Sequence, residues 1–159
     1  MNPKRILFVC TGNSCRSVMA QELMKHTLAR AGITTVQVES AGVFAIEGMG
    51  PTGETRRVLQ DAGLDCAGHR ARTLTSEMVE RADLILVMER LHAEEVIRRL
   101  PSTRDKIHLL KAYGASTTSE LSVNIPDPIG KPLEVYEVCF ADIREAVERV
   151  ARSLGVHSA

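Results

Sequence analysis

Short apolar runs alternate with amphipathic segments along this chain, and the alternation limits the possible folds more than any other feature. The runs at 6–9 and 83–88 are dominated by β-favouring apolar residues, as expected of strands that are buried on both faces. Two more strands are predicted at 35–39 and 106–110. Helical spacing of apolar residues predicts helices at 16–31, 52–62, 76–81, 91–100 and 133–153. This order predicts an α/β fold, a three-layer sandwich with a parallel sheet between helices.

Composition argues against several classes of function. The chain has 20 Lys and Arg residues and 20 Asp and Glu residues, so its formal net charge is zero, and it has no Trp. It therefore has no net positive charge and, with three Phe and two Tyr, few of the aromatic side chains that nucleic-acid and membrane binding use. No segment approaches the roughly 20 apolar residues that span a bilayer, and the first apolar run is too short for a signal peptide. We expect a cytoplasmic protein with one domain, 1–159, in which the charged segment 89–100 is a solvated face.

The stretch ILFVCTGNSCRS, residues 6–17, joins the first predicted strand to the first predicted helix. Cys10 lies at the carboxyl end of the strand, where α/β proteins bind their ligands, and Arg16 follows at a C-x5-R spacing. The loop around Gly12 offers successive backbone N–H groups, the helix N-terminus adds positive potential, and the guanidinium of Arg16 matches a phosphoryl group. The loop is thus predicted to bind a phosphoryl dianion. The same field favours a thiolate at Cys10, to which Ser17 can donate a hydrogen bond.

Other interpretations of these residues are weaker. The loop is not G-x-G-x-x-G and no Walker lysine follows it, so both nucleotide-binding motifs fail. A zinc site would need Cys10 and Cys15 to join Cys66 and His69, but the C-x4-C spacing is loose and the chain has no C-x2-C pair. The plainest alternative makes Cys10 a small core residue. Without an export signal, all four cysteines, including Cys139, are expected to be free thiols.

A thiolate that attacks phosphorus needs a proton donor for the leaving group. Asp127, in the stretch NIPDPIG just before the last predicted helix, is the best candidate, because two flanking prolines restrict its backbone. On its own, Asp-Pro would indicate only a turn that starts a helix. The loop that contains Cys10 is what favours the catalytic interpretation.

Taken together, these motifs resemble the low-molecular-weight protein phosphatase family over essentially the full length of the chain. The matching stretches, in order, are the loop at 10–17, SAG at 40–42 and DP at 127–128. The resemblance implies a four-stranded parallel sheet with flanking helices, no metal and no cofactor. It also implies a phosphocysteine mechanism, in which Cys10 is the nucleophile, Arg16 binds the phosphoryl oxygens, and Asp127 is the general acid and then the general base.

The resemblance also assigns supporting roles. The remaining phosphate-binding positions are Thr11, Gly12, Asn13, Ser14, Cys15 and Ser17. Asn13 and Ser40 would hold the shape of the loop by hydrogen bonds. His69, in GHRAR, resembles a family histidine that supports the same network; without the motif it would be a surface histidine. Cys15 resembles the family's second loop cysteine, which could trap oxidised Cys10 as a disulfide and protect it from further oxidation.

Two positions bear on the substrate. Phosphotyrosine members of the family commonly have a bulky aliphatic residue after the loop Asn and an aromatic residue after Asp-Pro, where this chain has Ser14 and Ile129. The phosphoarginine branch has Thr at the first position, and Ser14 is similar to it. SAGVFA at 40–45 and LKAYG at 110–114 also resemble that branch, whereas GHRAR at 68–72 resembles the tyrosine type. We expect a protein phosphatase that favours phosphoarginine, with phosphotyrosine as the alternative.

Two other classes of protein could use the same loop. An arsenate reductase would share the fold, but it needs two relay cysteines near 80–90, where this chain has none. A non-catalytic phosphate-binding module would keep Arg16 and the loop but would not need Cys10, Ser17 and Asp127 together. The expected partner is a phosphorylated protein, with no nucleic acid and no membrane, and a monomer is expected.

Overall fold

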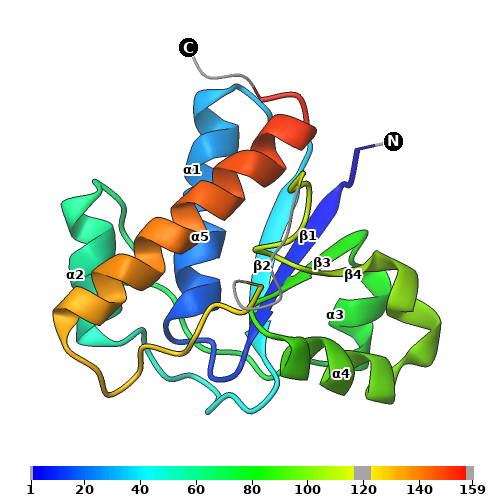
Figure 1. Cartoon of the computed structure of the whole chain (residues 1–159), viewed down its shortest axis with the longest axis horizontal. Helices are drawn as coiled ribbons and strands as arrows, with labels where there is room; N and C mark the ends of the chain where they lie inside the picture. Colours follow the sequence, from blue (N-terminus) through cyan, green and yellow to red (C-terminus); the bar gives the residue numbers. More distant parts are fainter. Residues whose placement is uncertain (1, 117–122, 157–159) are drawn as a thin grey trace.

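The computed structural model describes residues 2–116 and 123–156, and it has the α/β architecture that the sequence pattern predicts (Figure 1). The strands in these ranges are β1 (Arg5–Cys10), β2 (Gln37–Gly42), β3 (Leu84–Val87) and β4 (Ile107–Leu109). The helices are α1 (Arg16–Arg30), α2 (Gly53–Asp61), α3 (Ser76–Arg81), α4 (Arg90–Arg99), the 3-10 helix η1 (Pro101–Lys106) and α5 (Leu133–Ser153). None of the helices in these ranges combines the length and the apolar composition that crossing a membrane requires.

The four strands form one parallel sheet in the order β2-β1-β3-β4. β1 lies in the middle, where Cys10 is in register with Gly42 of β2, and Val9 is in register with Val87 of β3. The chain passes from β1 to β2 on one side and then to β3 on the other, so its direction across the sheet reverses between β1 and β3. Ligands of open α/β sheets bind outside the carboxyl ends of the strands at such a point, and Cys10 is the last residue of β1.

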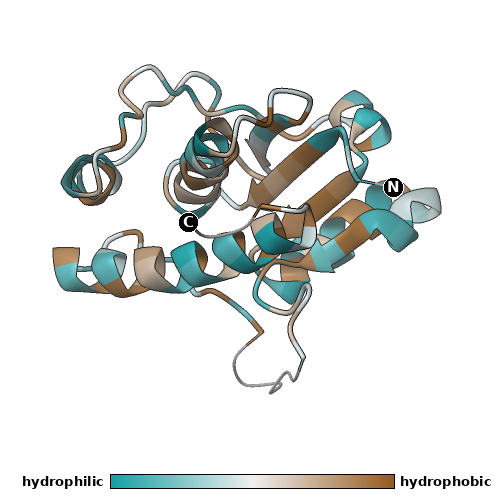
Figure 2. Ribbon diagram, turned by 90° about the horizontal axis from the view of Figure 1, so that it is seen from above, coloured by the Kyte–Doolittle hydropathy of each residue, from teal (hydrophilic) through white to brown (hydrophobic). Residues whose placement is uncertain are grey.

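Helices cover both faces of the sheet, which explains the continuous apolar composition of β1. Ile6 and Phe8 pack into a core with residues of α1 and α5, whereas Leu7 and Val9 pack into a second core with residues of α3 and α4. Figure 2 shows the strands in the brown of apolar residues, between helices that change from teal to brown along their length. The middle layer is therefore buried on both sides, as the three-layer prediction requires.

Three strands match their predicted ranges to within one residue at each end, and β2 differs more. β2 runs from Gln37 to Gly42, whereas the sequence pattern predicts 35–39. Ser40, Ala41 and Gly42 continue the parallel ladder beside β1, although their small side chains give no strand signal. The ladder is made by backbone groups, so pairing with a central strand outweighs the weak β-propensity of these residues. The segment at 115–124, which is rich in Ser and Thr and for which the sequence predicts a loop, lies largely outside the described residues.

Candidate active site

The loop between β1 and α1 surrounds the sulfur of Cys10 with hydrogen-bond donors. Cys10 is 2% exposed, and its Sγ accepts a hydrogen bond from the backbone N–H of Asn13 at 3.2 Å. Ser17 Oγ lies 2.9 Å from the same sulfur. Because Ser17 Oγ accepts from the side-chain amide of Asn13 at 2.8 Å, its own O–H is available to the sulfur. The first turn of α1 contains no acidic residue, so the positive potential of the helix N-terminus also favours negative charge at Cys10.

Asn13 holds the loop in its conformation. Its φ of 54° is in the left-handed region, which a short polar side chain tolerates better than most. Its Nδ2 also donates to Ser40 Oγ at 2.9 Å, and Ser40 Oγ donates to Gln21 Oε1 at 2.7 Å. Asn13 Oδ1 accepts the backbone N–H of Arg72 at 3.0 Å, and the Asn13 carbonyl oxygen accepts from His69 Nε2 at 2.9 Å. The structure thus places Asn13, Ser40 and His69 in one hydrogen-bond network, in which Asn13 and Ser40 are buried.

Gly42 lies directly against the loop. A Cβ at this position would be 2.4 Å from the carbonyl oxygen of Thr11 and 3.0 Å from the backbone nitrogen of Asn13. We therefore expect Gly42→Ala to displace the loop and to lower turnover by about 100-fold, because a displacement near 1 Å costs a reaction about that much. Steady-state kinetics measures the loss. Gly53→Ala, whose added Cβ would meet open space, is the control, and equal turnover in the two variants would contradict the prediction.

Arg16 is 1% exposed, and its guanidinium is held by four groups. It forms an ion pair with Glu89 and donates to the carbonyl oxygen of Ile125 at 2.6 Å. Its Nη2 lies 3.4 Å from Thr11 Oγ1 and 3.7 Å from Asp127 Oδ2. A buried charge without partners would be strongly destabilising. These contacts therefore both stabilise the cation and fix the orientation of its planar fork beside the loop.

The first turn of α4 contributes two residues that no sequence motif placed at the site. Glu89, the N-cap residue of α4, pairs with Arg16, and His92 is fully buried. His92 Nδ1 accepts the backbone N–H of Glu89 at 3.0 Å, and its Nε2 lies 2.9 Å from Thr11 Oγ1. The prediction of a solvated face for 89–100 is therefore wrong for this turn. The sequence signal that could have revealed this turn was the spacing of a capping box, in which an acidic residue at the N-cap of a helix is followed three positions later by a polar residue.

The burial of His92 has a consequence for stability. Burial and, to a smaller extent, the charge of Arg16 lower the pKa of His92 to about 4, whereas the charge of Asp127 opposes the shift. The unfolded chain would take up a proton at the ordinary value of 6.5, so we expect stability to fall as the pH drops from 6.5 to about 4. His92→Asn should show a shallower fall over this range in urea unfolding at a series of pH values. His26→Asn, at an exposed position of α1, should keep the wild-type slope; an unchanged slope in His92→Asn would contradict the prediction.

Asp127 reaches the loop from the segment that precedes α5. Its Oδ1 accepts the backbone N–H of Ile129 at 3.1 Å, a turn that orients the carboxylate. Asp127 lines a pocket of about 250 Å³ whose wall also includes Cys10 and Arg16. A sulfur, a fixed cation and a carboxyl group thus border one hollow, although they come from opposite ends of the chain.

Comparison with known proteins agrees with this geometry. The family model described as low molecular weight phosphotyrosine protein phosphatase matches residues 5–158. This chain belongs to that family. The protein-arginine-phosphatase of Geobacillus stearothermophilus is 36% identical to this phosphatase over 96% of this chain and 97% of its own length. The low molecular weight protein-tyrosine-phosphatase Etp of Escherichia coli is 33% identical over 94% of this chain and 93% of its own length.

A solved structure supports the same assignment for the phosphatase. It contains the arginine phosphatase YwlE as a cysteine-to-serine mutant with a phosphorylated active-site serine. Its TM-score is 0.87 at 32% identity, and the match covers 95% of each chain. The predicted fold, four parallel strands with helices on both faces, is therefore confirmed as that of the family. The chain is a cysteine-dependent protein phosphatase.

The other cysteines of the phosphatase have different surroundings. Cys15 Sγ lies 3.6 Å from Tyr136 Oη and 3.5 Å from Thr52 Oγ1, and neither of these neighbours was indicated by a motif. Burial raises the pKa of Tyr136 to about 12, so its hydroxyl stays protonated. Burial also raises the pKa of Cys66 to about 11 and that of Cys139 to about 12. Both are therefore buried thiols that are protonated at neutral pH, and both are free cysteines, as the sequence predicts.

The zinc alternative finds no geometric support. Among residues 2–116 and 123–156, the structure contains no group of three or more His, Cys, Asp or Glu side chains that could hold a metal ion. Cys15 instead faces α2 and α5, and His69 contacts the Asn13 carbonyl oxygen.

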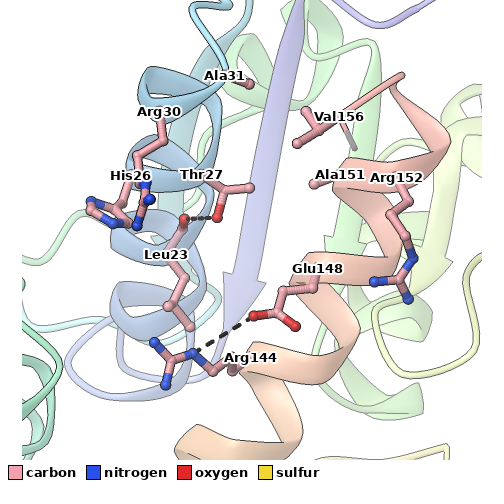
Figure 3. A pocket seen from close by; sticks show the side chains of 10 residues that line it. All are labelled: Leu23, His26, Thr27, Arg30, Ala31, Arg144, Glu148, Ala151, Arg152 and Val156. Carbon is pink, nitrogen blue, oxygen red and sulfur yellow. Dashed lines mark hydrogen bonds and ion pairs between the residues drawn. The ribbon is translucent and has the colours of Figure 1, made fainter. Parts of the chain in front are cut away.

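A second hollow of the phosphatase, of about 320 Å³, lies between α1 and α5 (Figure 3). Arg30, Arg144, Arg152 and Glu148 line it, and Arg144 pairs with Glu148 at 3.8 Å. No cysteine or aspartate is among its lining residues. This second hollow therefore offers no thiol nucleophile among its lining residues.

Proposed function

We propose that this phosphatase removes phosphoryl groups from arginine side chains of proteins through a phosphocysteine at Cys10. The observation that carries the proposal is the sulfur of Cys10, which contacts Asn13 N–H and Ser17 Oγ in a pocket that Arg16 and Asp127 also line. A stabilised nucleophile, a ligand for the phosphoryl oxygens and a proton donor are the groups that this reaction needs.

The reaction would proceed in two displacements. In the first, Cys10 Sγ attacks phosphorus, the bond from phosphorus to the leaving nitrogen breaks, and Asp127 gives that nitrogen its proton. Arg16 and the loop N–H groups bind the phosphoryl oxygens throughout. In the second, the Asp127 carboxylate takes a proton from water, and the water oxygen attacks phosphorus and breaks the S–P bond. The products are inorganic phosphate and the Cys10 thiolate, which Ser17 stabilises.

The pocket wall supports phosphoarginine as the substrate. Ser14 is 5% exposed and lines the pocket with a small hydroxyl, which leaves space for a planar guanidinium. The carboxylate of Asp127 can pair with a guanidinium as well as protonate its nitrogen. The relative from Geobacillus stearothermophilus is named a protein-arginine-phosphatase, which supports the same choice.

Phosphotyrosine is the second candidate, and one observation favours it. Four apolar residues line the pocket with large exposed fractions, Phe44 at 69%, Ile46 at 64%, Met49 at 46% and Ile129 at 54%. Apolar and aromatic side chains at a pocket mouth can pack against a phenyl ring. Etp, named a protein-tyrosine-phosphatase, fits this alternative.

A direct comparison separates the two substrates. Phosphate release would be measured from a phosphoarginine-containing protein and from a phosphotyrosine peptide, with Cys10→Ser as the blank. A higher kcat/KM for phosphoarginine supports the proposal. A higher value for phosphotyrosine would replace it with the second candidate, and binding without Cys10-dependent release from either would indicate a non-catalytic module.

Ser14 is expected to set this preference. Isoleucine at position 14 would occupy space inside the pocket. We therefore expect Ser14→Ile to lower kcat/KM for phosphoarginine by about tenfold relative to kcat/KM for an aryl phosphate, because a change of a few methyl or methylene groups in a pocket typically changes discrimination by about that factor. Ser14→Thr keeps a small hydroxyl and is the control. If Ser14→Ile left the ratio of the two substrates unchanged, Ser14 would not be the specificity residue.

We further propose that residues 1–159 act as one domain, as a cytoplasmic monomer without a cofactor, on phosphorylated protein. Elution as a monomer in size-exclusion chromatography would support the proposed oligomeric state.

We also propose that Cys15 forms a disulfide with oxidised Cys10, since both thiols belong to the same short loop. Mass mapping after mild peroxide treatment tests the pairing.

A further inference from the structure

His92 is a buried histidine to which the proposed reaction assigns no role. Its exposed fraction is 0%, and it lies in the first turn of α4, where the charges of Arg16 and Asp127 both act on its ring. Both ring nitrogens have a partner, one in the backbone of its own helix and one in the loop of the nucleophile. A ring held at both nitrogens has a fixed orientation and a fixed tautomer.

The partners determine which nitrogen carries the proton. The backbone N–H of Glu89 can only donate, so His92 Nδ1 is the acceptor of that 3.0 Å bond. A neutral ring then carries its proton on Nε2. The hydrogen bond of 2.9 Å to Thr11 Oγ1 therefore runs from His92 to Thr11. Burial and the charge of Arg16, opposed by Asp127, lower the pKa of His92 to about 4, so the ring is neutral at physiological pH.

Thr11 Oγ1 has a second donor. Arg16 Nη2 lies 3.4 Å from the same oxygen, so both of its lone pairs face N–H groups. The hydroxyl hydrogen is left for an acceptor elsewhere. Thr11 lines the pocket of Cys10, where the phosphoryl oxygens of a substrate would be the acceptors.

We propose that His92 is a positioning residue that makes the Thr11 hydroxyl a dedicated hydrogen-bond donor to the phosphoryl group. The proposal rests on the proposed function, because it takes the pocket to be a phosphoryl site. Without the His92 N–H, the Thr11 hydroxyl can rotate and donate to other groups, including the carboxylate of Asp127. A donor fixed before the substrate arrives needs no reorganisation as charge develops on the phosphoryl oxygens.

The test uses orthovanadate and inorganic phosphate as inhibitors of aryl phosphate hydrolysis. His92→Asn keeps an acceptor near Nδ1 but loses the donor to Thr11, whereas His92→Gln keeps a donor near Nε2. We expect His92→Asn and Thr11→Val each to raise the inhibition constant of vanadate by about tenfold, the size expected for one hydrogen bond to a charged group. The double variant should be no worse than either single variant, because both remove the same bond. His92→Gln, Thr11→Ser and the surface control His26→Asn should each have an inhibition constant for vanadate near that of the wild-type enzyme.

A purely structural role for His92 would give different results. Unchanged inhibition by vanadate in His92→Asn, or additive losses in the double variant, would overturn the proposal. If His92→Asn does not fold, the Thr11 variants still test the donor, and heteronuclear NMR of the wild-type imidazole tests the tautomer; a proton on Nδ1 would overturn the proposal as well. Failure of the proposed function is distinguishable, because it is measured on the wild-type enzyme alone: phosphate release would be absent, or kcat/KM would be higher for phosphotyrosine, whatever the variants do in the vanadate assay.

Discussion

Replacing Cys10 by serine is expected to lower kcat by about 10⁴-fold or more, as the loss of a covalent nucleophile does in other enzymes. Serine is close to cysteine in size and keeps the contacts with Asn13 N–H and Ser17 Oγ. A serine hydroxyl is not ionised at neutral pH, however, so the field of the loop has no anion to stabilise. Steady-state phosphate release measures the loss, and calorimetry with inorganic phosphate should show binding within a few-fold of wild type.

Cys139→Ser is the matched control for this substitution. Cys139 lies in α5, is 5% exposed, and has a pKa raised to about 12, mainly by burial. The same chemical change there should leave most of the activity. Near-wild-type turnover by Cys10→Ser, or an equal loss in Cys139→Ser, would contradict the assignment of the nucleophile.

Asp127→Asn is expected to lower kcat by about 10²- to 10⁴-fold on substrates whose leaving group must be protonated. An amide oxygen can still accept the backbone N–H of Ile129, so the turn should survive, but no proton is available for transfer. The loss should be smallest for aryl phosphates whose phenols leave readily as anions. The measurement is kcat across a series of aryl phosphates ordered by leaving-group basicity.

Asp61→Asn provides the comparison for Asp127→Asn. Asp61 pairs with Arg57 on the exposed surface of α2, at 3.3 Å, far along the chain from the catalytic loop. It should show wild-type kinetics with every leaving group. If the loss in Asp127→Asn were the same for all leaving groups, Asp127 would be acting on the shape of the pocket and not as the acid.

The fold class was predictable because its signals are local. The buried strand β1, the loop with Cys10 and the start of α1 at Arg16 follow one another in the sequence. A parallel sheet then requires Cys10 to lie at the edge where ligands bind. Asp127 could be connected to this edge only through the chemistry that the Cys10 loop requires and through the family resemblance, since a lone Asp-Pro carries no information about distant parts of the chain.

The parts that could not be predicted depend on contacts between distant segments. Glu89 and His92 begin a helix whose charged residues indicate solvent, and only the three-dimensional structure brings them to Arg16 and Thr11. Tyr136 likewise reaches Cys15 from a helix at the other end of the chain. In these cases burial, not residue type, decides what the side chain does.

Trapping the phosphorylated enzyme tests the central claim most directly. The wild-type enzyme and Asp127→Asn would be mixed with a phosphoarginine-containing protein, denatured within milliseconds and analysed by peptide mass spectrometry. We predict a phosphoryl group on Cys10 that forms at least as fast as turnover, and that persists longer in Asp127→Asn because hydrolysis of the intermediate lacks its base. Phosphate release with no phosphoryl group on Cys10, or with the group on another residue, would contradict the mechanism.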